Sequence, residues 1–219
     1  MPHKEKAFFC EVVSSLFCPP DQEMVEQLTQ GHLYSFFKAY AQSLEGEIGC
    51  LKGFLPESPS QILLRDLKEE YYRLFSDTGG ERISLVESFY KPWTQDPHCS
   101  LPFAKEKGFL MGDSAVHLSA LFQQWGIEVS GSFKGMPDHL IIELELLSYL
   151  YREAGDEVIE RFIKDHLDWI PFLKEACERA NAHPFYRSLM EVLHLFIQKE
   201  KERLEKRSDG TKEIYPEVI

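Results

Sequence analysis

Cysteine is scarce in this sequence, and its arrangement excludes two classes of protein. The five cysteines are odd in number and widely spaced, and none forms a Cys-x-x-Cys pair. A disulfide framework normally uses an even set of cysteines, and a zinc ribbon uses paired Cys-x-x-Cys motifs. The chain also lacks a run of about 18 apolar residues, the length of a membrane span. Its first ten residues, MPHKEKAFFC, hold no apolar core of signal-peptide length. We therefore expect a cytoplasmic protein.

Positive charge is scarce as well. The 24 Lys and Arg residues face 36 Asp and Glu residues, which gives a formal net charge of −12. A general nucleic-acid binder needs cations for the phosphates, so this class is disfavoured. The acidic excess is concentrated in 137–179, where eleven Asp and Glu residues accompany five Lys and Arg residues. Such a surface favours a cationic partner, or it is simply a solvated face.

Catalytic motifs are missing too. The sequence contains neither a Gly-x-x-x-x-Gly-Lys-Ser/Thr loop nor a Gly-x-Gly-x-x-Gly turn after a strand. One Glu-x-x-His spacing, Glu191 to His194, has no second copy, although a di-iron bundle needs two. His98-Cys99 is isolated, and His166 has no evident set of partner residues. We expect no enzyme, and a helical metal- or nucleotide-dependent enzyme is the first alternative.

Helical patterns account for most of the 219 residues. Apolar residues recur three and four positions apart, and we find no convincing alternating strand. The expected helices are 4–17, 22–30, 32–45, 59–76, 113–125, 137–153, 156–166, 171–181 and 184–206. The pattern predicts an all-α, bundle-like single domain of roughly eight to ten helices over residues 1–206. A flexible tail, 207–219, follows it.

Several helix ends carry specific signals. Pro19-Pro20 stops the first helix, Asp21 can cap the second, and Gly31 ends it. Ser58 is the expected N-cap of the helix at 59–76, with Gln61 completing a capping box.

The segment 77–111 differs from the rest because it is rich in glycine and proline. A loop this long in a compact domain is usually functional or a linker. Its aromatic residues argue against a simple solvated linker, and they are Phe89, Tyr90, Trp93, Phe103 and Phe109.

The densest polar pattern is the segment 137–145, Pro-Asp-His-Leu-Ile-Ile-Glu-Leu-Glu. Asp138 lies at a helix start, where the macrodipole favours an anion. His139 and Glu143 are four residues apart and can meet on one face, whereas Glu145 shares another face with Asp138. An ordinary capped amphipathic helix is the alternative explanation.

Four stretches together resemble the TorD/DmsD/NarJ family of chaperones for molybdenum-containing redox enzymes. They are Glu70–Phe75 (Glu-Tyr-Tyr-Arg-Leu-Phe), Glu87–Tyr90 followed by Pro92, Pro137–His139 with Glu143–Glu145, and His166-x-x-Trp169-x-Pro171-Phe172. Their order and spacing cover residues 70–172.

The resemblance implies an all-helical cytoplasmic chaperone without a chemical step of its own. Such proteins bind an apoenzyme, often through its twin-arginine leader, and hold it until the molybdopterin cofactor is inserted and the enzyme is exported. The resemblance implies no required cofactor, although weak contact with guanine nucleotide or molybdopterin is possible. It implies a monomer or a domain-swapped dimer. A helical scaffold that recognises no leader is the second alternative.

A twin-arginine leader combines two guanidiniums with an apolar segment, so its site needs carboxylates and an apolar groove. We expect the loop 87–97 to pack beside the start of the helix 137–153 and to form that groove. The predicted peptide-binding residues are Tyr90, Trp93, Pro137, Asp138, His139, Glu143 and Glu145. If the leader has lost its arginines, the apolar part carries the binding. Arg73 is expected to pair with a buried glutamate such as Glu145.

Overall fold

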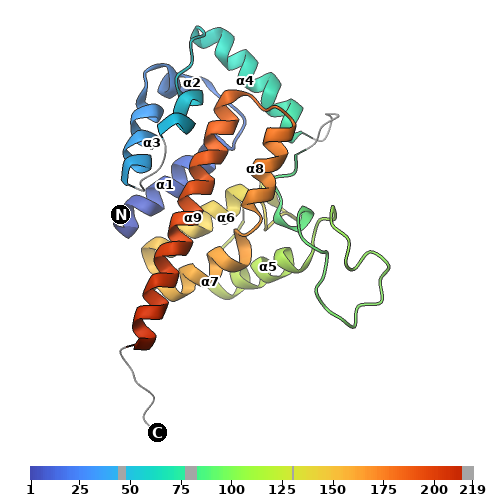
Figure 1. Cartoon of the computed structure of the whole chain (residues 1–219). Helices are drawn as coiled ribbons and strands as arrows, with labels where there is room; N and C mark the ends of the chain where they lie inside the picture. The colour runs from blue at the N-terminus through green and yellow to red at the C-terminus, as the bar shows by residue number, and fades with distance from the viewer. Residues whose placement is uncertain (44–47, 77–82, 130, 214–219) are drawn as a thin grey trace.

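A computed structural model of the chain describes residues 1–43, 48–76, 83–129 and 131–213 (Figure 1). These residues form nine α-helices and three short 3-10 helices, and no β-strand is found among them, which confirms the all-α prediction. The α-helices are α1 (His3–Leu16), α2 (Gln22–Thr29), α3 (His32–Ser43), α4 (Ser60–Phe75), α5 (Asp113–Trp125), α6 (Leu140–Glu153), α7 (Asp156–His166), α8 (Ile170–Arg179) and α9 (Pro184–Glu213). The 3-10 helices are η1 (Ile48–Phe54), η2 (Glu87–Phe89) and η3 (Gly131–Phe133).

Local sequence signals set several helix ends as predicted. The Asp21 carboxylate accepts a hydrogen bond from the Met24 backbone N–H at 2.8 Å and so caps α2. Gly31 follows α2 with a φ of +75°, and Gly126 ends α5 with a φ of +64°. Both glycines adopt the left-handed conformation that side chains with a Cβ disfavour.

Two predicted helix starts are wrong. Helix α4 begins at Ser60, and Pro59 occupies its N-cap position with an extended ψ of 147°, so the capping box from Ser58 to Gln61 does not form. Helix α6 begins at Leu140 and not at Pro137, because Asp138 is hydrogen-bonded to the long loop and His139 forms a bridge with Val86. His139 is the N-cap of α6, and its Nδ1 accepts from the Ile141 N–H at 3.2 Å.

Helix α6 is the central helix of the fold. Ten of its residues are buried, on all sides of the helix, which explains why its sequence is apolar nearly throughout. It packs against α1 on one side and α7 on another. Only a few α6 side chains are exposed, and they include Glu145 and Tyr149.

Helix α9 runs along the length of the molecule, with α2, α3 and α4 around one end and α5 and α7 at the other (Figure 1). It packs against η1, α8, α7 and α1. Phe196 of α9 stacks on Phe9 of α1 with ring centroids 4.3 Å apart. Helix α9 extends to Glu213, beyond the expected end at 206, and 214–219 lie outside the described residues.

A buried ion-pair group joins α1, α6, α7 and α9, and we call it the Lys6–Glu200 cluster. Lys6 and Glu200 are 1% and 2% exposed, and their charged atoms lie 2.7 Å apart. The Tyr151 hydroxyl donates to Glu200 at 2.8 Å. Arg203 bridges Glu200 at 3.0 Å and Asp156 at 3.1 Å. Each buried acid in this cluster therefore faces a cation.

The long loop is irregular as predicted from 83 to 112, apart from the single turn of η2. The expected start of this loop, 77–82, lies outside the described residues. In Figure 1 the loop projects from the helical body beside α5. None of the helices that the structure describes combines the length and apolarity needed to cross a bilayer.

Candidate functional site

The base of the long loop is hydrogen-bonded to the start of α6. Val86 and His139 form an isolated antiparallel bridge. The Glu87 N–H donates to the Asp138 carbonyl at 2.9 Å, and the Leu140 N–H donates to the Leu85 carbonyl in the loop at 2.7 Å. The prediction that the loop packs beside the start of this helix is confirmed.

Asp138 joins the loop, α5 and α6. Its carboxylate is fully buried and accepts from the Ser88 N–H at 2.9 Å and from the Ser88 hydroxyl. The same hydroxyl accepts from the Gly112 N–H at 3.2 Å, directly before α5. Residue 112 must be glycine, because a Cβ there would lie 2.7 Å from the Trp93 carbonyl oxygen. Burial raises the pKa of Asp138 despite its bonds to Ser88.

Glu87, Glu143 and His166 form a second buried group beside Asp138. All three side chains are at most 2% exposed, and Nδ1–H of His166 donates to Glu87 Oε2 at 2.9 Å. Burial, and then the negative charge of Glu87, raise the pKa of Glu143 well above its usual range. Burial opposes ionisation of Glu87 as well, but hydrogen bonds from His166 and Glu143 outweigh it and lower the pKa of Glu87. The surroundings of Glu143 therefore favour its protonated form, and those of Glu87 favour its ionised form.

Two further side chains complete this group, which we call the carboxylate cluster (Glu87, Ser88, Lys91, Asp138, Glu143, His166 and Trp169). Trp169 is fully buried and donates from Nε1 to the His166 carbonyl at 2.8 Å and to Glu143 at 3.1 Å. The Lys91 ammonium lies 2.5 Å from Glu87 and 2.6 Å from Asp168. The cluster thus ties the loop to α6 and to the turn between α7 and α8.

The carboxylate cluster contains three residue types that bind metals. One ligand atom each from Glu87, Glu143 and His166 lies within 4.8 Å of the others. A divalent cation there would lie beside the Lys91 ammonium and would have to displace the proton of Glu143. The donor set fits a hydrogen-bonded network that fixes the loop better than a resident metal.

The partners of His166 were not predicted, because they come from segments far apart in the chain. The Glu-x-x-His spacing from Glu191 to His194 was the metal-like pattern in the sequence, and Glu191 forms an ion pair with Lys174 at 3.0 Å. The expected pairing of Arg73 with Glu145 is wrong. Arg73 pairs with Glu70 at 2.7 Å, and Glu145 is exposed on α6.

The seven predicted peptide-binding residues fall into three groups by exposure. Pro137, Asp138 and Glu143 are buried, Tyr90, Trp93 and His139 are half-buried, and Glu145 is exposed. The buried carboxylates act on the shape of the loop, and only Glu145 presents a carboxylate to solvent. Their role in peptide binding stays a prediction.

The half-buried aromatic residues are packed against other rings. Tyr90 stacks on Trp169 with centroids 5.2 Å apart, and its hydroxyl donates to the Ser84 carbonyl at 2.9 Å. Trp93 lies edge-on to Phe103 at 5.2 Å. Tyr90 thus holds the loop against the turn between α7 and α8, and the contact between Trp93 and Phe103 joins two parts of the loop.

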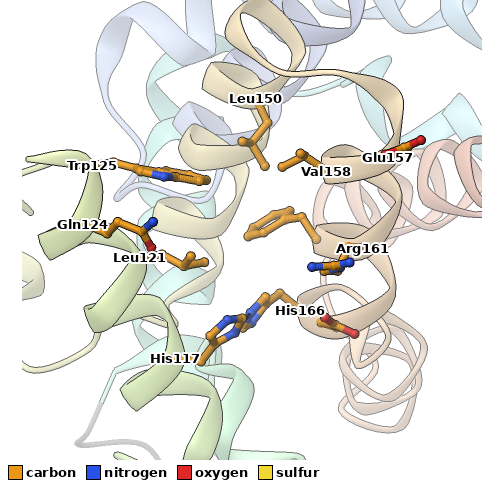
Figure 2. Close-up of a pocket in the computed structure, with 11 residues that line it drawn as sticks. His117, Leu121, Gln124, Trp125, Leu150, Glu157, Val158, Arg161 and His166 are labelled. Atoms are coloured by element: carbon orange, nitrogen blue, oxygen red, sulfur yellow. Dashed lines mark hydrogen bonds between the residues drawn. The ribbon is translucent and has the colours of Figure 1, made fainter.

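A pocket of about 440 Å³ opens between α5, α6 and α7, next to the carboxylate cluster. In Figure 2, Trp125 and Leu121 face Val158 and Arg161 across it. His117 lies at one end, with its Nδ1 2.8 Å from Nε2 of His166. Burial and the neighbouring imidazole lower the pKa of His117. This histidine pair links the pocket to the cluster.

A second groove, which we call the acidic groove, has a volume of about 480 Å³. It lies between the end of α5, residues 127–129, Phe133 and α6. Its apolar residues are Phe122, Ile127, Val129, Phe133, Ile142 and Leu146. Glu128, Glu145 and Tyr149 complete the lining. Both glutamates are exposed, and neither forms an ion pair within the described residues.

The fold and the site define an all-helical protein in which buried polar residues hold a long loop against a central helix. The family profile named nitrate reductase delta subunit matches residues 37–202, which is more than half of the chain. The chain belongs to this family of NarJ/TorD chaperones, which mature redox enzymes and are not catalytic. The resemblance seen in the sequence is confirmed.

Individual relatives agree with this assignment. The chain is 26% identical over 171 residues to "Chaperone protein TorD" of Vibrio cholerae O395, covering 71% of this chain and 77% of the relative. It is 29% identical over 166 residues to the protein of the same name from Salmonella schwarzengrund, covering 72% and 78%. The expectation that the protein is no enzyme is thereby confirmed.

Proposed function

We propose that this protein binds the precursor of a molybdopterin-containing oxidoreductase, through its twin-arginine leader, its apoenzyme or both. It holds the precursor until the cofactor is inserted and the enzyme is exported from the cytoplasm. The protein acts by binding and release, and it needs no cofactor of its own. Weak contact with guanine nucleotide or molybdopterin stays a prediction.

The observation that best supports precursor binding is the apolar surface of the long loop. Leu101, Phe109, Leu110 and Met111 are between 39% and 45% exposed. Three of them are consecutive, and an exposed apolar patch is typical of an interaction site. Met111 also has a φ of +58°, a strained conformation for a residue with a Cβ. The carboxylate cluster, which includes Ser88, holds the base of this loop. An apolar segment of an unfolded or cofactor-free enzyme suits such a surface.

The test is calorimetric binding of leader peptides from candidate molybdoenzymes, and of the apoenzyme with and without its leader. We expect binding by the leader that weakens at higher salt and when both arginines are replaced by lysine, because lysine lacks the bidentate guanidinium. Binding of the apoenzyme is expected to fall at least about five-fold in Leu110→Ser, about 1 kcal/mol of lost apolar contact. The control is Val116→Ser, at an apolar residue of α5 that is 60% exposed, more than Leu110 at 39%.

The scaffold alternative makes a different prediction. A scaffold that recognises no leader would bind the folded enzyme, and an excess of leader peptide would not compete. Failure of every leader and every apoenzyme to bind a well-folded protein would contradict the proposed function.

A further inference from the structure

The acidic groove combines an apolar floor with carboxylates at its rim. Phe122, Ile142 and Leu146 supply part of the floor, and no lysine or arginine is among its lining residues. Tyr149 is 45% exposed at one side and offers an aromatic face. The groove therefore suits a partner that has both a cationic and an apolar part.

The carboxylates of the groove differ from the other acids of the segment 137–145. Asp138 accepts two hydrogen bonds from Ser88, and Glu143 is bonded inside the carboxylate cluster. Glu145 is exposed, and among the described residues neither it nor Glu128 has a cationic partner. Although Glu145 is exposed, partial desolvation of its carboxylate, and then the charge of Glu11, raise its pKa. A cation that entered the groove would relieve this repulsion.

We infer that the acidic groove is the binding site for the arginine-bearing part of the leader. This inference rests on the proposed function, and it places the binding of the leader's arginines in the acidic groove. A guanidinium hydrogen-bonds to Glu145 or Glu128, and its planar face packs on Tyr149. The neighbouring apolar residues of the leader lie on the floor of the groove. Asp138 and Glu143 contribute by fixing the start of α6 and not by touching the peptide.

The experiment is titration calorimetry of one twin-arginine leader peptide against the full chain and three variants. The variants are Glu145→Gln, the double variant Glu128→Gln/Glu145→Gln, and the control Glu153→Gln, an exposed glutamate of α6 outside the groove. We expect the single variant to weaken binding at least about five-fold and the double variant at least about ten-fold, about 1.4 kcal/mol. The control is expected to change the affinity less than about two-fold, since it lies outside the groove and only alters net charge.

A second comparison tests for direct contact. A leader in which one arginine is replaced by glutamine should lose affinity for the wild-type chain, and this loss should shrink in the double variant because the two changes remove the same contact. All variants alter exposed side chains, so their thermal unfolding should match that of the wild type.

The outcomes separate the two proposals. If the leader binds the wild type and the double variant behaves like Glu153→Gln, the acidic groove is overturned as the site while the proposed function stands. If no leader binds the wild type but the apoenzyme does, the groove is overturned and binding belongs to the loop surface.

Discussion

In the described part of the chain, two buried polar clusters lie at opposite ends of α6. They differ in whether their buried carboxylates are matched by cations. In the Lys6–Glu200 cluster, Lys6 and Arg203 lie against Glu200. Burial opposes ionisation of Glu200, but hydrogen bonds from Arg203 and Lys6 outweigh it, and its pKa is lowered. In the carboxylate cluster, Asp138 and Glu143 have raised pKa values, burial being the main cause.

This difference in charge pairing indicates which part of the molecule serves stability alone. Matched charges make the first cluster a fixed clamp between the two ends of the chain. The carboxylate cluster retains excess acid next to the loop that we propose binds the client, and such locally unfavourable arrangements concentrate at functional sites. The predictions below compare the two clusters, beginning with the largest effect.

Removing a cation from the matched cluster should have the largest effect. Lys6→Met is expected to lower the free energy of unfolding by about 3 kcal/mol or more, because it leaves Glu200 buried with one cation fewer. Urea unfolding measures this loss. The control is Lys4→Met on the exposed side of α1, which should change stability by less than about 0.5 kcal/mol. Equal effects of the two variants on the free energy of unfolding would contradict the role of the Lys6–Glu200 cluster as a clamp.

Removing a donor from the carboxylate cluster should cost less. Trp169→Phe keeps the ring but deletes the N–H that bonds Glu143 and the His166 carbonyl. We expect a loss of about 1–3 kcal/mol in the same assay, since two buried acceptors lose their donor. Trp125→Phe, at an exposed tryptophan on α5, serves as the matched control and should be close to neutral.

The two clusters should respond to pH in opposite directions. The folded-state pKa of Glu143 is raised, so its contribution to stability is full below its ordinary value of 4.5 and is lost as pH rises through the folded pKa. The folded-state pKa of Glu200 is lowered, so its contribution is present above 4.5 and is lost as pH falls. Glu143→Gln should therefore gain stability relative to the wild type as pH rises from 5 to 8 (about 1 kcal/mol). The stability that Glu200→Gln loses relative to the wild type should be nearly constant above pH 5 and should shrink as pH falls below 4.5. Parallel pH profiles for the two variants would remove the distinction between the clusters.

The cap of α6 should also respond to pH. Burial lowers the pKa of His139 to about 4, so its stabilising contribution is present above pH 6.5 and is lost as pH falls toward 4. Nuclear magnetic resonance titration of the imidazole should show a midpoint near 4, and His139→Asn, which keeps a capping side chain, identifies the resonance. A midpoint above 6 would place the ring in solvent.

The helices and the contact between the loop and α6 were predictable from sequence. Local signals predict these helices because they act within a few positions along the chain. Examples are the cap Asp21, the terminator Gly126 and the helical spacing of apolar residues. The start of α4 was not predicted correctly, because Pro59 fits either the first turn or the position before it.

The burial of Asp138 and Glu143 was not predictable from local pattern. An acid at a helix start is equally consistent with an exposed cap, and here the deciding partners are Ser88 and Trp169, which lie 50 and 26 residues away along the chain. The partners of His166 were not predictable for the same reason, since Glu87 lies 79 residues away along the chain. Sequence motifs identified the participants, and only the fold distinguished the residues that build the site from the exposed Glu145.

The Lys6–Glu200 pair also constrains the order in which the chain can fold during synthesis. Its partners are 194 residues apart, so the ammonium on α1 leaves the ribosome long before its carboxylate on α9. Helix α1 can dock on α6 earlier, but that docking buries a cation without its counter-charge. We therefore expect the docking of α1 on α6 to stay reversible until α9 has left the ribosome and supplied Glu200.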